Sequence, residues 1–137
     1  MEASTRAALD RERYISLATF RRSGIAVETP VWFAGHGERF YVFSEARAGK
    51  VKRLRNSDRA RVASCDVRGR VRGPWHEARA QRVSDPGLVS SAYDALRVKY
   101  GWQMRLADFF SRLAGRIDAR AILEIEVLEP ATSETGR

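Results

Sequence analysis

The sequence predicts a mainly β domain, a small antiparallel barrel of six strands with a few short helices. Three β-rich runs follow one another in the N-terminal part of the chain, and short turns that contain glycine join them, as in a β-meander. The helical patterns come later, and the last apolar run alternates like a strand. Six strands with helices inserted late favour a barrel that its last strand closes.

The N-terminal part contains one expected helix and the first three expected strands. Residues 5–13 (TRAALDRER) have a helical pattern and follow Ser4, a residue type that caps helix N-termini. Two β-rich runs, 14–21 (YISLATFR) and 25–34 (IAVETPVWFA), flank Gly24, whose backbone freedom suits a tight hairpin. The turn GHGE at 35–38 then leads into the third strand, 39–44 (RFYVFS).

A short amphipathic helix follows the third strand, because Val51 and Leu54 are three residues apart and share a face. Residues 59–67 and 75–83 return to β character on either side of a turn, RGRVRGP. Helices are expected at 86–101, between an N-terminal proline and a terminating glycine, and from about Trp102 to Leu113.

The last strand, residues 119–130 (ARAILEIEVLEP), closes the fold. Its alternation places residues 121, 123, 125 and 127 on one face and residues 122, 124, 126 and 128 on the other. Pro130 ends this strand, so residues 1–130 are expected to form a single domain and residues 131–137 a frayed tail.

Composition limits the classes of function. The 137 residues are 44% hydrophobic and carry a net charge of +8, so a single cored domain with an anion-attracting surface is expected. One cysteine, Cys65, and two histidines exclude an internal disulfide framework and a structural zinc site. No signal peptide or bilayer-spanning run is present, which predicts a cytoplasmic protein without a membrane partner.

The segment SEARAGKVKRLRN, residues 44–56, concentrates positive charge where the third strand passes into the short helix. A helix N-terminus presents free N–H groups and a positive dipole end, so this junction suits a phosphate. Ser44 supplies a hydroxyl, Lys50 a compact charge, and Lys52 or Arg53 a second cation. The alternative interpretation is an ordinary solvated helix face.

Pro30 interrupts the second β-rich run directly before Trp32. Proline removes a ladder hydrogen bond and is therefore usually confined to edge strands or bulges. Such a break exposes backbone donors and acceptors beside an aromatic ring, which suits the edge of a planar heterocycle. The alternative is an edge proline next to a core tryptophan.

Three stretches carry a resemblance to a known family: residues 15–33 (ISLATFRRSGIAVETPVWF), 40–64 (FYVFSEARAGKVKRLRNSDRARVAS) and 75–83 (WHEARAQRV). TPVWF and GKVKRLRNSDR are the most specific parts, and KYGW at 99–102 resembles one subgroup. The order resembles the pyridoxamine 5'-phosphate oxidase-like FMN-binding split-barrel superfamily, and within it the small branch of oxidoreductases that use the deazaflavin coenzyme F420.

The resemblance implies a six-stranded split β-barrel that forms a homodimer with cofactor sites at the subunit interface. The residues from the second strand are expected along the cofactor ring, those from the loop and helix at its phosphate, and a tryptophan reaches in from the partner. The expected cofactor-binding residues are Thr29, Pro30, Val31, Trp32, Ser44, Lys50, Lys52, Arg53 and Trp75.

The expected reaction is hydride transfer to a conjugated, planar small molecule. No catalytic side chain is expected, because a hydride carrier brings its own reactive atom. The sequence leaves two interpretations of His76, Tyr100 and Trp102: a role near the site, or a surface or core position. Cys65 is expected to be a buried packing residue.

Three alternatives remain open from the sequence. FMN carries a similar ring and phosphate, although the surplus arginines Arg47, Arg55, Arg68 and Arg72 suit the glutamate tail of coenzyme F420. A cofactor-storage protein without turnover has the same residues. A small basic barrel that binds nucleic acid is the competitor from another class.

Overall fold

The structure, a computed structural model, describes residues 3–113 and 120–128. Seven strands and four helices are assigned within these ranges. In chain order they are α1 (Ala3–Asp10), β1 (Tyr14–Phe20), β2 (Ala26–Val31), β3 (Phe33–His36), β4 (Arg39–Glu45), α2 (Gly49–Asn56), β5 (Arg59–Cys65), β6 (His76–Val83), α3 (Pro86–Tyr100), α4 (Trp102–Leu113) and β7 (Arg120–Val127).

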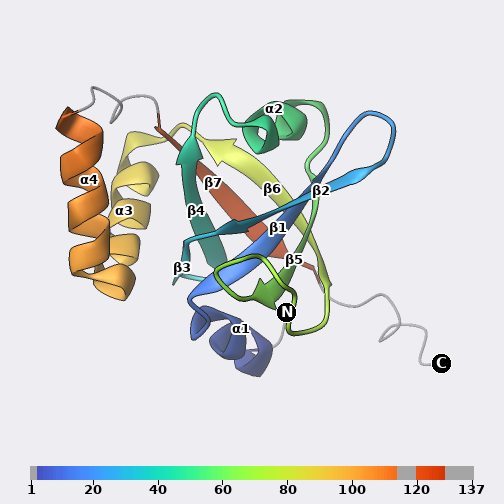
Figure 1. The fold of residues 1–137 in the computed structure, drawn as a ribbon, viewed down its shortest axis with the longest axis horizontal. Coiled ribbons are helices and arrows are strands. Elements are labelled where there is room, and N and C mark those ends of the chain that lie inside the picture. The colour runs from blue at the N-terminus through green and yellow to red at the C-terminus, as the bar shows by residue number, and fades with distance from the viewer. Residues whose placement is uncertain (1–2, 114–119, 129–137) are drawn as a thin grey trace.

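The strands form one antiparallel sheet in the order β2-β1-β5-β6-β7-β4-β3, curled into a half-barrel (Figure 1). Its two edge strands, β2 and β3, are consecutive in the chain and are separated by a single residue, Trp32. The mainly β split-barrel fold predicted from the sequence is therefore confirmed.

The strand count differs from the expected six because the run at 25–34 is divided. Its first part pairs with β1, from Phe20↔Ala26 to Ile15↔Val31. Its second part pairs with β4, from Phe33↔Val42 to His36↔Arg39. One bent run thus supplies both edges of the sheet, and Pro30 lies on an edge strand, as its missing N–H requires.

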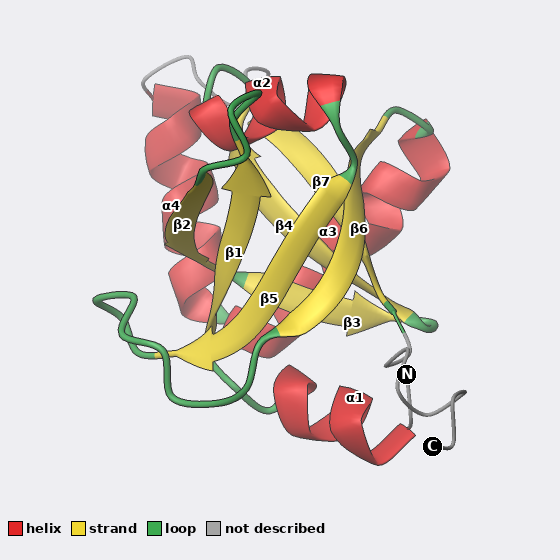
Figure 2. Cartoon of the chain, turned by 90° about the vertical axis from the view of Figure 1, so that its right-hand side faces the viewer, coloured by secondary structure: helices red, strands yellow, loops and turns green. Residues whose placement is uncertain are grey.

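The concave face of the sheet holds the main core, which includes Leu17, Phe33, Phe40, Leu123 and Ile125. Figure 2 shows α1 and α2 at opposite ends of the curled sheet, where they cover the concave interior. Leu9 from α1 and Val51 from α2 belong to this core. The two helices therefore close the barrel at its ends.

A second core lies between the convex face of the sheet and α3 (Figure 1). Ala92, Leu96 and Tyr100 of α3 pack there against Tyr41 and Ile122. The alternation predicted for the last strand is confirmed, because Ile122 faces this second core while its neighbours at 121 and 123 face the first.

The proline and glycine signals predicted for α3 are confirmed. The structure adds an N-cap that was not predicted, Asp85, whose carboxylate accepts from the N–H of Leu88 at 2.9 Å. Pro86 occupies the first turn, and Gly101 ends the helix with φ of 59°. The hairpin at Gly24, which has φ of 91°, is also confirmed.

The expectation for the first helix is wrong at both ends. The helix spans Ala3–Asp10, so Ser4 lies inside it and is not its N-cap. It ends at Asp10, whose carboxylate accepts from the N–H of Gly35 in β3 at 3.1 Å. Residues 11–13 then lead into β1. The predicted tail, 131–137, and Pro130 lie outside the described residues.

No helix in the described ranges is long and apolar enough to cross a bilayer.

Lys99 lies near the end of α3 in a mostly apolar setting. Its Nζ is 3.5 Å from the centre of the Phe33 ring and 3.5 Å from Asp10 Oδ1. Burial lowers the pKa of Lys99 to about 8, although Asp10 acts in the opposite direction. The charged form of this lysine is therefore disfavoured in the folded chain.

This burial predicts a pH-dependent stability. The folded chain releases the Lys99 proton near pH 8, whereas the unfolded chain keeps it up to the ordinary value of 10.5. Between these values the unfolded state binds more protons, so the free energy of unfolding rises with pH. Urea unfolding from pH 7 to 10 should show a steeper rise in the wild type than in Lys99→Met, because the raised pKa values of Cys65 and Tyr100 oppose the rise equally in both proteins. Lys52→Met, at an exposed lysine, should keep it; equal slopes in all three proteins would contradict the prediction.

Candidate functional site

The candidate site lies in the split where β2 and β4 separate. The pairing of β3 with β4 ends at Phe33↔Val42. Continuing this register would place Trp32 opposite Phe43 and Val31 opposite Ser44, but the chain turns away there to pair with β1. A pocket of about 250 Å³ occupies the gap, and its walls are Pro30, Val31, Trp32, Phe43, Ser44, Glu45, Ala48 and Lys50.

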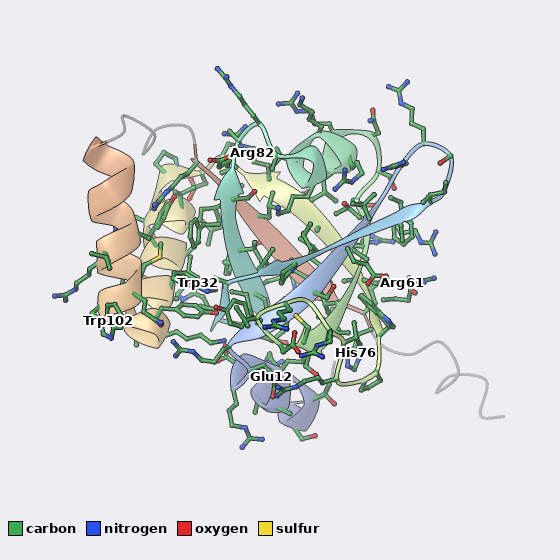
Figure 3. All side chains as sticks on the ribbon, in the orientation of Figure 1. Glu12, Trp32, Arg61, His76, Arg82 and Trp102 are labelled. Carbon is green, nitrogen blue, oxygen red and sulfur yellow. The ribbon has the colours of Figure 1, made fainter. Side chains whose placement is uncertain are left out.

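Aromatic rings form one wall of this pocket. Trp32 stacks on Tyr100 with ring centres 4.6 Å apart and planes 11° from parallel. It also meets Phe43 edge to face at 5.9 Å. Figure 3 shows Trp32 on the side of the sheet that faces α3. Trp32 therefore belongs to the second core and to the pocket wall at once.

The other end of the pocket is cationic. Lys50, in the first turn of α2, is half-buried, and the helix is preceded by Ala48, which has no side-chain oxygen to cap its N–H groups. Burial lowers the pKa of Lys50, repulsion from Arg53 lowers it further, and Glu45 opposes both. Ser44, also buried, donates its hydroxyl to the Glu45 carbonyl at 3.2 Å. This end of the pocket favours an anion.

Arg53 supports the site from within the fold. Its Nε donates to Thr19 Oγ1 of β1 at 2.7 Å. A Cβ built on Gly49 would lie 2.6 Å from Arg53 Nη1, so the guanidinium crosses closely over the start of the helix. Glycine at position 49 therefore leaves room for a second cation beside Lys50.

Five of the nine predicted site residues line the pocket: Pro30, Val31, Trp32, Ser44 and Lys50. The pocket also uses three that the sequence analysis missed: Phe43, Glu45 and Ala48.

The other four predicted residues lie outside the pocket lining. Thr29 Oγ1 is buried on the same strand and has no hydrogen-bond partner. Lys52 is exposed on α2, and Arg53 is turned toward Thr19. Trp75, 37% exposed, lies in the loop before β6 and does not line the pocket of its own chain.

The remaining singled-out side chains fall elsewhere. His76 lines a second pocket of about 370 Å³ between α1 and the start of β6, together with Glu12 and Ser64 (Figure 3). Tyr100 is buried, whereas Trp102 is 71% exposed. Cys65 is a buried packing residue, as predicted, and burial raises the pKa of its thiol.

The sequence profile of the family described as pyridoxamine 5'-phosphate oxidase matches residues 1–132. The chain belongs to this family. Among functionally curated proteins, no sequence matches the chain at a significant level. The family assignment agrees with the split-barrel topology and with the resemblance seen in the sequence.

Solved structures show the same fold at low sequence identity. The conserved hypothetical protein Rv2991 from Mycobacterium tuberculosis superposes with a TM-score of 0.69 and 19% identity, over 94% of this chain and 82% of that one. The heme storage protein HutZ from Vibrio cholerae superposes with a TM-score of 0.69 and 12% identity, over 94% of this chain and 91% of that one. A structure described as F420 reductase superposes with a TM-score of 0.58 and 18% identity, over 90% of this chain and 92% of that one.

The geometry predicts that Arg53 adds to the effect of burial in lowering the pKa of Lys50. Replacing Arg53 with Gln removes one positive charge beside Lys50, so the pKa of Lys50 should rise toward its ordinary value. The chain has three lysines, so a side-chain NMR titration resolves each one. Arg55→Gln, at an exposed position of the same helix, is the matched control. An unchanged Lys50 pKa in Arg53→Gln would show that burial alone sets it.

Proposed function

We propose that this chain is an oxidoreductase that uses the deazaflavin coenzyme F420 to transfer a hydride to a conjugated, planar small molecule. The observation that carries the proposal is the composition of the split. A half-buried ammonium group and an uncapped helix start close one end of a pocket whose other wall is aromatic. Membership in the pyridoxamine 5'-phosphate oxidase family supports it.

The cationic end fits the cofactor phosphate. Burial and the neighbouring Arg53 both disfavour the charged form of Lys50. A bound anion would stabilise that charged form and offset both effects. Lys50 binds the phosphate as a point charge, and the first N–H groups of α2 and the Ser44 hydroxyl donate to its oxygens. Arg53 adds positive potential from behind.

The aromatic wall and the β2 edge fit the cofactor ring. Val31 and Trp32 offer apolar surface to the ring. β2 is an edge strand, so its backbone N–H and C=O groups on the outer side are not paired with another strand. When bound, the cofactor supplies the hydride chemistry. The residues of this chain bind the ring, orient it and exclude water from one side of it.

The pocket of one chain is small for the complete ligand. Its volume of about 250 Å³ lies below the roughly 300–1,000 Å³ of typical small-molecule sites. The loop at Gly69 lies against the Pro30 ring at the pocket rim, and the same loop exposes Val67, Val71 and Trp75. A homodimer, in which a second copy covers this apolar surface and completes the site, is therefore part of the proposal.

FMN is the second candidate cofactor, because the same ammonium and helix start serve its phosphate. Exposed arginines near the split favour the deazaflavin with its acidic tail, and Arg47, Arg55 and Arg68 are available for it. The likeness to a heme storage protein shows that this fold also occurs in a protein described by storage rather than by turnover. Turnover therefore has to be measured as well as binding.

Lys50→Ala tests the phosphate assignment. Removing the ammonium should weaken coenzyme F420 binding by about tenfold to a hundredfold, since a charge-assisted contact in a partly buried site is worth about 1.5–3 kcal/mol. Fluorescence titration of the purified protein measures the Kd. Lys52→Ala is the matched control, because this lysine is exposed on the same helix and outside the pocket; its Kd should stay within about twofold.

Titration of the wild type with coenzyme F420, with FMN and with DNA at two salt concentrations decides between the functions. Tight binding of coenzyme F420, together with oxidation of its reduced form by a quinone-type acceptor that is reduced in turn, supports the proposal. Tight binding without turnover indicates a storage protein. Tighter binding of FMN than of coenzyme F420 would make FMN the assigned cofactor. Salt-sensitive DNA retention with neither cofactor bound would overturn the assignment.

A further inference from the structure

We propose that Tyr100 is a positioning residue that fixes the indole of Trp32 as the wall of the cofactor pocket. Tyr100 does not line the pocket itself. It lies at the last position of α3. Its ring contacts the indole of Trp32, and its hydroxyl contacts the backbone of Phe33. The inference rests on the proposed function only for its effect on cofactor binding.

The hydroxyl of Tyr100 completes the open edge of β3. β3 is the last strand of the sheet, so the backbone of Phe33 has no neighbouring strand on one side. Phe33 N–H donates to the Tyr100 hydroxyl at 3.0 Å, and the hydroxyl lies 3.0 Å from the Phe33 carbonyl and 2.9 Å from the Arg13 carbonyl. Tyr100 thus takes the place of a missing strand at the residue that follows Trp32.

The ring of Tyr100 fixes the adjacent indole. The 4.6 Å stack covers one face of Trp32, so this face is closed to a ligand. Because the hydroxyl is held by Phe33 and Arg13, the ring cannot swing away from the indole without breaking these hydrogen bonds. The indole therefore has a single supported orientation, with only its other side available to the pocket.

The same contacts connect the pocket wall to α1. Lys99, next to Tyr100, pairs with Asp10, and Asp10 holds the Gly35 N–H. β3 is thus held at Phe33 by Tyr100 and at Gly35 by Asp10, which pairs with Lys99. Burial raises the pKa of Tyr100 to about 12, so its hydroxyl remains protonated and able to donate at neutral pH.

Two substitutions separate the hydroxyl from the ring. Tyr100→Phe keeps the stack and removes the hydroxyl, and Tyr100→Leu removes both. Leu96→Ala, one turn earlier in the same core, is the control for general loss of packing, because Leu96 is buried in the same cluster and is not a partner in the Trp32–Tyr100 stack. Thermal unfolding of all three proteins establishes that each is folded at the assay temperature.

The first readout needs no cofactor. The chain has three tryptophans, so a Trp75→Phe/Trp102→Phe background leaves Trp32 as the only indole. In this background Tyr100→Leu should make Trp32 more accessible to acrylamide and shift its emission, whereas Leu96→Ala should leave both unchanged. Equal quenching in the Tyr100→Leu and parent proteins would overturn the proposal.

The second readout is the Kd for coenzyme F420 or FMN, whichever the wild type binds. Tyr100→Leu should weaken binding by about tenfold, Tyr100→Phe by less, and Leu96→Ala by under about twofold. Wild-type affinity in Tyr100→Leu, or an equal loss in Leu96→Ala, would overturn the positioning role. If the wild type binds neither cofactor, the proposed function fails, and the quenching experiment still decides the role of Tyr100.

Discussion

The bend at Trp32 is the constraint on which the rest of the structure depends. The sheet curls far enough that one run of sequence has to pair with β1 in its first part and with β4 in its second. A single residue connects the two parts, so Trp32 cannot pair with either neighbour. The gap opposite it is therefore a consequence of barrel geometry, and the pocket needs no insertion or added loop.

The partly buried charge of this protein is more informative about an anion site than its exposed charge. The net charge of +8 is spread over many exposed arginines, which mainly favour solubility and general attraction of anions. Lys50 differs because it is half-buried at the pocket and lies beside Arg53, with Glu45 as the nearby counter-charge. Two cations held close together at a helix start are costly without an anion. That cost favours an anion at this end of the split more than at the basic surface.

Local patterns predicted the strands and helices well, because alternation and helix signals depend on near neighbours. The division of residues 25–34 was not predicted, since pairing with two different strands depends on distant residues. For the same reason Phe43 was missed: it faces the pocket only because the β3–β4 register ends one residue earlier. The sequence could have predicted that Lys50 and Lys52 do not both face the pocket, because residues two apart on a helix point to different sides.

Trp32 ties the stability of the second core to the properties of the pocket. Its indole packs with Tyr100 and Phe43, and the same ring forms a wall of the pocket. This wall is therefore part of the contact between the sheet and α3. The ion pair of Lys99 with Asp10, and the hydrogen bond of Asp10 to Gly35, connect the end of α3 to α1 and β3. A change in that packing alters the pocket even when no pocket residue is replaced.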